Sequence, residues 1–204
     1  MAVVSDPPTL LVAERLQTPI GELILVTDET DRVRALEWED LEPRLQRLLR
    51  LHYGRPEAPL TARAAPSLAW RALQEYFEGQ LERIDAVPVA TGGTPFQRMV
   101  WTALRTIPAG HTMSYSELAI QIGRPAAVRA VGLANGANPI GVIVPCHRVV
   151  GRNAALTGYA GGLERKAWLL AHEGARQESF KHTATARASE LAQATDDASS
   201  GSRR

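Results

Sequence analysis

Residues 138–174 read NPIGVIVPCHRVVGRNAALTGYAGGLERKAWLLAHEG, and this stretch decides how the rest of the chain is interpreted. It contains the single cysteine of the chain, Cys146, after a run of β-branched residues and Pro145, which fixes the backbone before it. His147 follows at once, and Glu173 lies at the end of a helix predicted over residues 162–174. The stretch therefore offers a thiol, an imidazole and a carboxylate as candidate catalytic groups.

A thiol becomes a strong nucleophile only as a thiolate, which requires a nearby base or a positive field. His147 is the candidate base, acting directly or through a water molecule, and Glu173 is the candidate group that orients the imidazole. Neighbouring residues on an extended strand point to opposite faces, so direct contact between Cys146 and His147 needs a turn there, and otherwise a bridging water. The sequence leaves both arrangements open.

Each of these residues also has an ordinary structural interpretation. A lone cysteine is commonly buried and inert, a histidine is commonly a hydrogen-bonded structural group, and a glutamate on a helix is commonly solvated. One cysteine cannot form an internal disulfide, and one thiolate with scattered histidines does not make a structural zinc site. We therefore expect no metal and no cofactor, and the rest of the sequence has to decide the role of the cysteine.

The segment around the cysteine differs in charge from the rest of the chain. Residues 94–176 carry 9 Lys and Arg against 3 Asp and Glu, whereas residues 1–93 carry 10 against 15. The formal net charge of the whole chain is only +1. A basic segment is suited to a polyanion such as nucleic acid, although charge also varies along a chain without any function.

The basic segment also carries the pattern of several consecutive helices. Thr94 caps a helix that opens with a proline, and Ser114 with Glu117 predicts the capping box of a second helix over residues 115–123. A tight turn containing glycine then leads to a third helix over residues 126–135. The last two helices and their turn are typical of a helix-turn-helix, a pattern that also occurs in proteins that never bind DNA.

The residues before the basic segment predict a small α/β domain without a catalytic constellation. Two β-rich runs with a polar turn predict a hairpin, two amphipathic segments predict helices, and a short apolar run with a proline predicts an edge strand. In chain order these segments are residues 18–27, 32–38, 41–53, 66–79 and 86–90. We interpret their aromatic side chains as core residues.

These patterns predict a chain in three parts. An α/β domain with a small antiparallel sheet spans 1–90, a mainly α domain spans 94–176, and a disordered tail rich in Ala, Ser and Thr spans 177–204. No apolar run reaches the length of about 18 residues that a transmembrane helix requires, and the N-terminus lacks the pattern of a secretory signal. We expect a cytoplasmic protein without membrane contact.

The motif PCHRV at residues 145–149 resembles the active-site motif of the O6-alkylguanine-DNA alkyltransferases, also called methylated-DNA–protein-cysteine methyltransferases. The resemblance runs from about Thr94 to Ala175 and includes, in the order and spacing of that family, TPFQRMVW, IPAGHTMSYSELA, AVRAVG, NPI, IVPCHRVVG, TGYAGG and KAWLLAHEG. It implies a helix-turn-helix of the winged-helix type and repair of DNA by direct reversal of damage. An alkyl group on O6 of guanine would pass irreversibly to Cys146, once per molecule, with O4-alkylthymine left open as a substrate.

The resemblance assigns four catalytic positions. It implies that Cys146 accepts the alkyl group, that His147 is a base linked to it through water, and that Glu173 is the partner of His147. It also implies that Asn138 ties the helix-turn-helix to the active-site loop and helps to hold the surroundings of the nucleophile. No cofactor enters this scheme.

Five further positions would contact the DNA base. The O6 atom of guanine lies inside the duplex, so the nucleotide must be flipped out before a thiolate can approach it. By resemblance, Tyr115 hydrogen-bonds the guanine ring and stabilises the departing base, and Arg129 enters the base stack in place of the flipped nucleotide. Val149 and the backbone around Tyr159 and Ala160 form the wall of the pocket that receives the base.

The expected partner is double-stranded DNA that contains an alkylated guanine, bound by a monomer through the minor groove. Small residues on the second helix of the motif would permit close approach to that groove, and such binding is largely independent of sequence and sensitive to salt. Two positions depart from the family pattern. Ala160 stands where some members have Ser, and residues 135–137 lack an Arg often found before the Asn-Pro step.

Two other functions compete with this interpretation. A non-catalytic module of the same fold would bind the lesion without transferring the alkyl group, although some relatives of that kind have Trp in place of the acceptor Cys146. A cysteine hydrolase would use Cys146 and His147 on an acyl substrate and would have no need of Arg129. No loop that could form an oxyanion hole is identifiable in the sequence.

Overall fold

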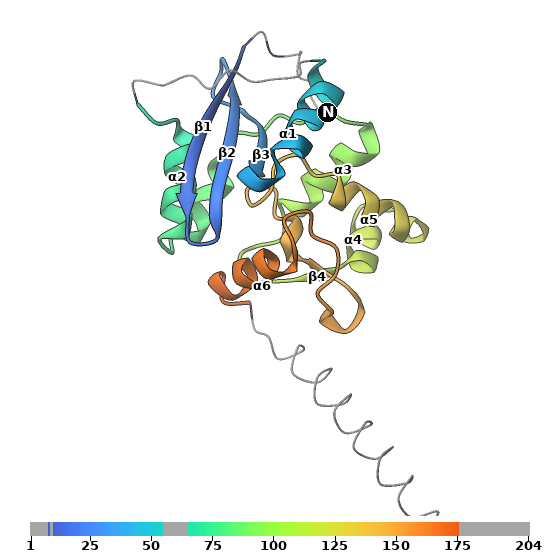
Figure 1. Cartoon of the computed structure of the whole chain (residues 1–204). Helices are drawn as coiled ribbons and strands as arrows, with labels where there is room; N and C mark the ends of the chain where they lie inside the picture. Colours follow the sequence, from blue (N-terminus) through green and yellow to red (C-terminus); the bar gives the residue numbers. More distant parts are fainter. Residues whose placement is uncertain (1–7, 9, 55–64, 176–204) are drawn as a thin grey trace, which may run out of the picture.

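The computed structural model describes residues 8, 10–54 and 65–175, and its elements are shown in Figure 1. A small sheet packed against two helices is followed by a group of helices that includes the cysteine-bearing turn. The predicted tail over 177–204 lies outside the described residues. Within the described part, no helix is long and apolar enough to span a membrane.

The N-terminal sheet is antiparallel, as predicted, and has the strand order β1-β2-β3. Its strands are β1 (Leu11–Thr18), β2 (Gly21–Asp28) and β3 (Val33–Trp38). The hairpin predicted over 18–27 and 32–38 is confirmed as β2 and β3, but β1 was not predicted. Thr18 ends β1, residues 19 and 20 form the turn and the next strand starts at Gly21, because the Thr18 hydroxyl donates to the carbonyl of Gly21 and accepts from the N–H of Ile20.

One helix covers each face of this sheet (Figure 1). The two helices predicted over 41–53 and 66–79 are confirmed as α1 (Glu42–Tyr53) and α2 (Leu68–Phe77). Successive residues of a strand face opposite sides, so Leu23 and Leu25 pack towards α2 while Ile24 and Val26 pack towards α1. The sheet is thus buried on both faces, and α2 contributes Ala69, Leu73 and Tyr76 to the larger of the two clusters.

The strand predicted over 86–90 is wrong as a continuous element. Residues Leu81–Ala86 form a 3-10 helix, and only Val89 makes an isolated parallel bridge, to Val33 of β3. Pro88 has no N–H to donate, so the segment is joined to β3 by two hydrogen bonds only, from Val33 N–H to Pro88 O and from Ala90 N–H to Val33 O.

The second part contains the helices predicted from their caps. They are α3 (Pro95–Leu104), α4 (Tyr115–Gln121) and α5 (Val128–Gly136). Thr94 caps α3 in a full capping box with Gln97, and the predicted box of Ser114 and Glu117 caps α4. The helix predicted from residue 126 starts two residues later, because Pro125–Ala127 first form a 3-10 turn.

The helix-turn-helix of α4 and α5 is followed by the cysteine-bearing segment and by α6 (Leu163–His172). Two short strands, β4 (Met113–Ser114) and β5 (Val149–Val150), pair in parallel and connect the start of α4 with the residues that follow the cysteine. The fold is therefore the predicted combination of a small α/β part and a mainly helical part. The winged-helix detail stays a prediction.

The two parts share one hydrophobic core. The cluster that contains Leu36 and Trp38 of β3 continues through Trp101, Val131 and Ile140 in the helical part. The backbone of Leu36 also accepts a hydrogen bond from Gly141 N–H at 3.1 Å and donates one to Pro139 O at 2.9 Å. The edge of the N-terminal sheet thus holds the segment that leads to Cys146.

Candidate active site

Cys146 lies in a turn instead of at the end of a strand. The β-branched residues before it form tight turns in which Val142 has a φ of 63°, a left-handed conformation that β-branched residues rarely adopt. Cys146 then opens a one-turn 3-10 helix with His147 and Arg148. The cysteine is only 6% exposed, and no hydrogen bond joins its sulfur to the ring of His147 in the described part of the chain.

His147 is paired with Glu173, as the sequence predicted. The Nε2–H of the imidazole donates to Oε1 of Glu173 at 2.9 Å, and both side chains are fully buried. Burial lowers the pKa of His147 from its ordinary value, and this effect outweighs the hydrogen bond that His147 donates to Glu173, which raises that pKa. His147 is therefore neutral at physiological pH, and its Nδ1 atom has no partner among the described residues. A neutral imidazole with an unused Nδ1 is equipped to accept a proton.

Arg148 is a buried member of the site that sequence reasoning missed. Its Nε and Nη2 donate to the two oxygens of Glu173 at 2.9 and 2.7 Å, and its Nη1 donates to Ile107 O. Burial alone would raise the pKa of Glu173, but the hydrogen bonds from His147 and Arg148 and the positive charge of Arg148 lower it well below its usual range. The carboxylate is therefore charged and fixed. The signal was present, because Arg148 is the fourth residue of PCHR.

The surroundings of the sulfur favour the neutral thiol in the resting protein. Burial raises the pKa of Cys146, while a hydrogen bond with Asn138 and the charge of Lys166 act to lower it. Lys166 of α6 is fully buried and donates to Val149 O and Thr157 O, each at 2.6 Å. Its own pKa is lowered to about 8, chiefly by burial. Lys166 is a second residue that sequence reasoning missed, although it opens the quoted motif KAWLLAHEG.

Asn138 holds the turn that carries the nucleophile. Its Nδ2 donates to Val144 O at 2.8 Å and to Ile140 O at 3.3 Å, and its Oδ1 accepts from Ile140 N–H. The residue lies two positions after Gly136, the last residue of α5. This buried side chain therefore links the helix-turn-helix to the residues that precede Cys146.

The predicted base-contacting residues divide between the site and the surface. Val149 is fully buried, Tyr115 and Tyr159 are half-buried, and Ala160 is exposed. The ring of Tyr159 lies edge-on to the ring of His147, with 6.5 Å between the ring centroids. Tyr115 opens α4, and its hydroxyl donates to Thr157 O and Gly158 O at 3.5 Å. Burial raises the pKa of both tyrosines, and each lies close enough to feel the charge of a Cys146 thiolate.

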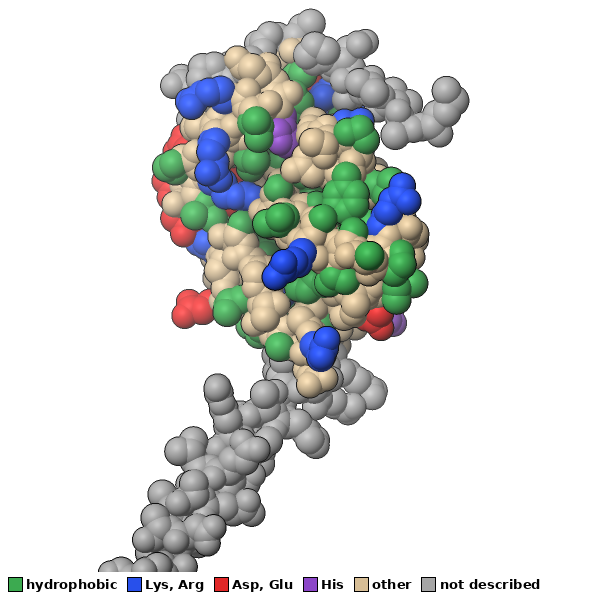
Figure 2. Space-filling view, turned by 90° about the vertical axis from the view of Figure 1, so that its right-hand side faces the viewer, with side chains coloured by type: hydrophobic (Ala, Val, Ile, Leu, Met, Phe, Trp, Pro, Cys, Tyr) green, Lys and Arg blue, Asp and Glu red, His purple; other side chains and the backbone are tan. Residues whose placement is uncertain are grey.

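Arg129 lies apart from these residues on the exposed side of α5. No hydrogen bond or ion pair holds it in the described structure, and Leu133, one turn further along the helix, is 77% exposed. Figure 2 shows the side of the molecule on which α3, α4 and α5 lie. Lys and Arg side chains are spread over it among hydrophobic ones, with Asp and Glu side chains near its margins. Such a face suits a polyanion.

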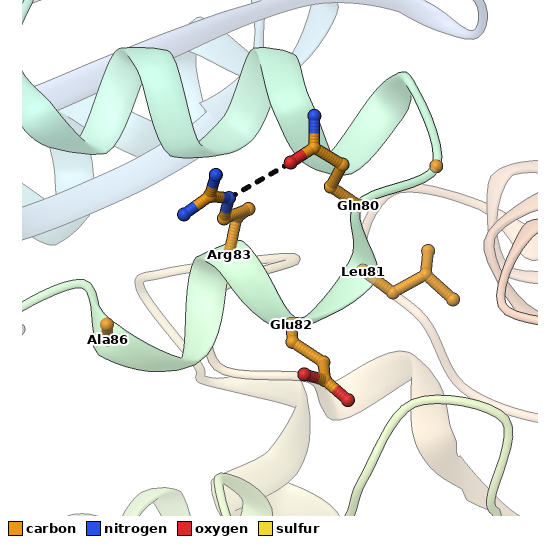
Figure 3. A pocket seen from close by; sticks show the side chains of 6 residues that line it. Gln80, Leu81, Glu82, Arg83 and Ala86 are labelled. Atoms are coloured by element: carbon orange, nitrogen blue, oxygen red, sulfur yellow. Dashed lines mark hydrogen bonds between the residues drawn. The ribbon is translucent and has the colours of Figure 1, made fainter.

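Three surface hollows lie away from the cysteine. One hollow of about 680 Å³ is lined by Gly79, Gln80, Leu81, Glu82, Arg83 and Ala86, and the side chain of Arg83 donates a hydrogen bond to that of Gln80 (Figure 3). The others, of about 630 and 480 Å³, adjoin the β1–β2 turn, on the sides of α6 and of α2. None of the three is lined by Cys146. In the described residues, no group of three or more His, Cys, Asp and Glu is placed to hold a metal.

Together the fold and the site define a two-part protein in which a cysteine–histidine–glutamate set stands beside a helix-turn-helix. Residues 95–175 match the family model of the 6-O-methylguanine DNA methyltransferase DNA binding domain, and residues 11–91 match that of the ribonuclease-like domain of the same proteins. This chain belongs to the 6-O-methylguanine DNA methyltransferase family.

Individual relatives agree with this assignment. A methylated-DNA–protein-cysteine methyltransferase of Shigella flexneri is 54% identical over 164 residues, which cover 80% of this chain and 96% of that protein. The crystal structure of Mycobacterium tuberculosis O6-methylguanine methyltransferase is similar with a TM-score of 0.66 and 42% identity, covering 82% of this chain and 94% of that one. A structure of the Mycobacterium tuberculosis protein in complex with DNA has a TM-score of 0.59 and 38% identity, covering 80% and 92%.

Proposed function

We propose that this chain repairs DNA by direct reversal, moving the alkyl group from O6 of guanine to the Sγ atom of its own Cys146. The observation that carries the proposal is the buried Cys146–His147–Glu173 set in a member of this family. A pure binding module has no use for a buried base and its charged partner beside a thiol. A cysteine hydrolase would have to regenerate its thiol, whereas a thioether bond to carbon is not hydrolysed.

The proposed reaction is one displacement with a proton relay. Cys146 gives its proton, through a water molecule, to the free Nδ1 of His147, and the imidazolium is stabilised by Glu173. The thiolate sulfur forms a bond to the alkyl carbon while the bond from that carbon to O6 breaks, and the bonding electron pair stays on guanine. Guanine takes up one proton in return for the proton that the thiol lost, and the protein keeps a neutral thioether. Each molecule therefore reacts once.

DNA recognition is assigned to the helix-turn-helix. The exposed Arg129 on α5 is free to enter the base stack, and the small residues of α5 permit approach to the minor groove. Tyr115, which opens α4, would donate its hydroxyl to the guanine ring as negative charge develops there. Val149 and the backbone at Tyr159 and Ala160 would form the wall of the base pocket.

The remaining expectations complete this proposal. We assign the α/β domain to 1–90 and the DNA-binding and catalytic domain to 94–176, and we expect a monomer that acts in the cytoplasm on duplex DNA containing an alkylated guanine. Light scattering of the free protein and of its complex with a short duplex tests the monomer. A mass that corresponds to two copies per duplex with one lesion would contradict it.

The decisive test compares the wild-type protein with Cys146→Ala on a duplex containing O6-methylguanine. Peptide mass spectrometry of the wild-type protein is expected to show the mass of one added methylene group on the Cys146 peptide. The variant is expected to bind the duplex and to transfer nothing. Transfer by the variant would refute the nucleophile, and binding without transfer by the wild-type protein would identify a lesion-recognition module.

A further inference from the structure

A tyrosine from the N-terminal part reaches the catalytic carboxylate. Tyr76 of α2 donates its hydroxyl to Oε1 of Glu173 at 2.8 Å, although the two residues are 97 positions apart in sequence. Tyr76 is fully buried, and Glu173 is 5% exposed. Oε1 is the same oxygen that accepts from Nε2 of His147. The base of the active site is therefore joined to the N-terminal part through a single shared oxygen atom.

Packing fixes the position of this hydroxyl from both sides of the contact. The backbone carbonyl of Tyr76 accepts from Nε2 of His172, the last residue of α6, at 2.7 Å. The rings of Tyr76 and His172 meet edge to face with centroids 5.2 Å apart, and Trp168 stacks on His172 at 4.8 Å. Helix α2 is thus clamped to the end of α6, directly before Glu173.

Oε1 of Glu173 accepts three hydrogen bonds, and each of them stabilises part of its negative charge. Oε1 of Glu173 accepts from His147 at 2.9 Å, from Arg148 at 2.7 Å and from Tyr76 at 2.8 Å. A hydrogen bond to a buried carboxylate is strong, and each further donor reduces the negative charge that the remaining donors feel. Burial and the neighbouring Glu173 raise the pKa of Tyr76 well above its ordinary value, so its hydroxyl stays a donor wherever the protein is folded.

From this geometry we infer that Tyr76 is a positioning residue for the alkyl transfer. Its hydroxyl holds Glu173 against His147 and limits the charge on the shared oxygen, so that the imidazole stays neutral and correctly turned until it receives the thiol proton. The inference rests on the proposed function, because it concerns the base of that reaction. It gives the N-terminal part a direct share in the chemistry, beyond covering the core.

The pH dependence follows from the groups that face His147. They are Lys166 of α6, Glu173 directly after α6, Cys146 and Arg148 from the turn of His147 itself, and Tyr159 from the following loop, with Tyr76 of α2 acting through Glu173. The substitution Tyr76→Phe leaves all these groups in place and removes only one hydrogen bond to Oε1 of Glu173. With one donor fewer, Glu173 attracts the imidazolium more strongly, and the pKa of His147 rises.

The experiment measures the rate of Cys146 alkylation by free O6-benzylguanine between pH 5 and 9 for the wild-type protein and Tyr76→Phe. The free base removes DNA binding from the measurement. In the variant, the acidic limb of the profile is expected to move to higher pH by about half to one unit, with a plateau lowered about tenfold because the imidazole is less well oriented. An unchanged midpoint together with an unchanged plateau would overturn the inference.

Tyr53→Phe is the matched control. The hydroxyl of Tyr53 also lies in the N-terminal part and donates to backbone carbonyls of Ala90 and Arg34, but it has no contact with Glu173. Both variants lose a hydroxyl of a partly or fully buried tyrosine, so both are expected to lower the melting temperature. Only Tyr76→Phe is expected to shift the pH midpoint, and an equal shift in both variants would show a merely structural role.

Two further measurements keep the outcome interpretable. The NMR titration of the His147 imidazole reports its pKa in both proteins without any transfer, and it is expected to rise in Tyr76→Phe. If Cys146 of the wild-type protein accepts no alkyl group, the proposed function fails, but the titration of His147 still decides whether Tyr76 controls the pKa of that imidazole. If Tyr76→Phe does not fold, site-specific 3-fluorotyrosine at position 76, a stronger donor, is expected to shift the midpoint of the wild-type profile to lower pH. A shift to higher pH, or none, would contradict the inference.

Discussion

The two parts of the molecule contribute to the site in different ways. The helical part contains the groups to which we assign the alkyl transfer, with Cys146 and His147 on one turn and Glu173 at the end of α6. The α/β part supplies none of them, yet it supplies hydrogen bonds that fix them. The backbone of Leu36 is hydrogen-bonded to the segment before the cysteine, and Tyr76 donates its hydroxyl to the carboxylate of Glu173. The groups assigned to the chemistry thus come from one part of the sequence, whereas hydrogen bonds that fix their positions come from residues far away in the other part.

Two arginines reinforce the joint between the parts. Arg44 of α1 pairs with Glu37 and donates to Gly136 O and Asn138 O, at the C-terminal end of α5. Arg165 of α6 belongs to the helical part and reaches the N-terminal sheet. Its guanidinium lies over the ring of Trp38, 4.5 Å from the ring centroid, and it donates to Ile20 O. Neither arginine touches the nucleophile. Each ties a functional segment to the N-terminal sheet or its helix, so the comparison can be tested residue by residue.

The largest effect is expected in the helical part, from Glu173→Gln. The change removes the charge that pairs with Arg148 and leaves a guanidinium buried without a counter-charge. We expect a loss of about 3–5 kcal/mol of unfolding free energy and a transfer rate at least about 100-fold lower. Denaturant unfolding and single-turnover kinetics measure the two effects. Unchanged stability would mean that the buried ion pair does not hold the site together.

Arg129→Ala is expected to lower the rate of repair of duplex DNA without lowering the rate of reaction with a free base. The side chain lies exposed on α5 and makes no described contact with the site. Repair of a duplex should slow by about ten- to a hundredfold, because flipping loses the group that fills the gap. Reaction with free O6-benzylguanine should keep its rate. Equal losses on both substrates would argue against a role in base flipping and would place Arg129 in the catalytic machinery.

A smaller effect is expected across the joint, from Arg44→Ala. The change frees the carbonyls of Gly136 and Asn138 and leaves Glu37 buried without its partner. We expect duplex repair to slow by about three- to tenfold through the loosened end of α5. Arg47→Ala is the control, because Arg47 is an exposed residue of the same helix. If both variants repair DNA at the wild-type rate, the joint does not support the helix-turn-helix.

The smallest effect is the pH dependence of stability. The pKa of His147 is lowered in the folded protein, so the unfolded chain binds a proton that the folded one refuses, and stability falls as the pH drops below about 6.5. The pKa of Glu173 is also lowered, so its contribution is complete above about 4.5 and is lost as the pH falls further. Denaturant titrations between pH 8 and 4 measure this. Stability that stays constant from pH 7 to 5 would contradict a buried neutral His147.

The same division explains how much the sequence predicted. Asn138, Cys146 and His147 lie within ten residues, and Glu173 follows a helix with a clear pattern, so the motif indicated their proximity correctly. Tyr76 sits at helical spacing from Leu73 and looks like one more apolar core residue, and it is indeed buried. Its hydroxyl partner lies 97 residues away, which no local pattern reveals.

The fold prediction was wrong where a local hydrogen bond or a proline overrides the strand propensity of the sequence. Thr18 and Ile20 have high strand propensity, but the Thr18 hydroxyl closes a turn there and β1 ends at Thr18. Residues 86–90 are a short apolar run that favours a strand, but Pro88 limits them to two hydrogen bonds with β3. In the site, the β-branched run before Cys146 turns instead of extending, because Asn138 captures its carbonyls.

The most direct test of the account is a titration of the wild-type protein with increasing amounts of duplex carrying radiolabelled O6-methylguanine. The account predicts that labelled methyl bound to protein rises linearly and stops at one per molecule, with all of it on the Cys146 peptide as a thioether. Continued conversion of O6-methylguanine to guanine within the duplex after that point, or label on any other residue, would contradict it.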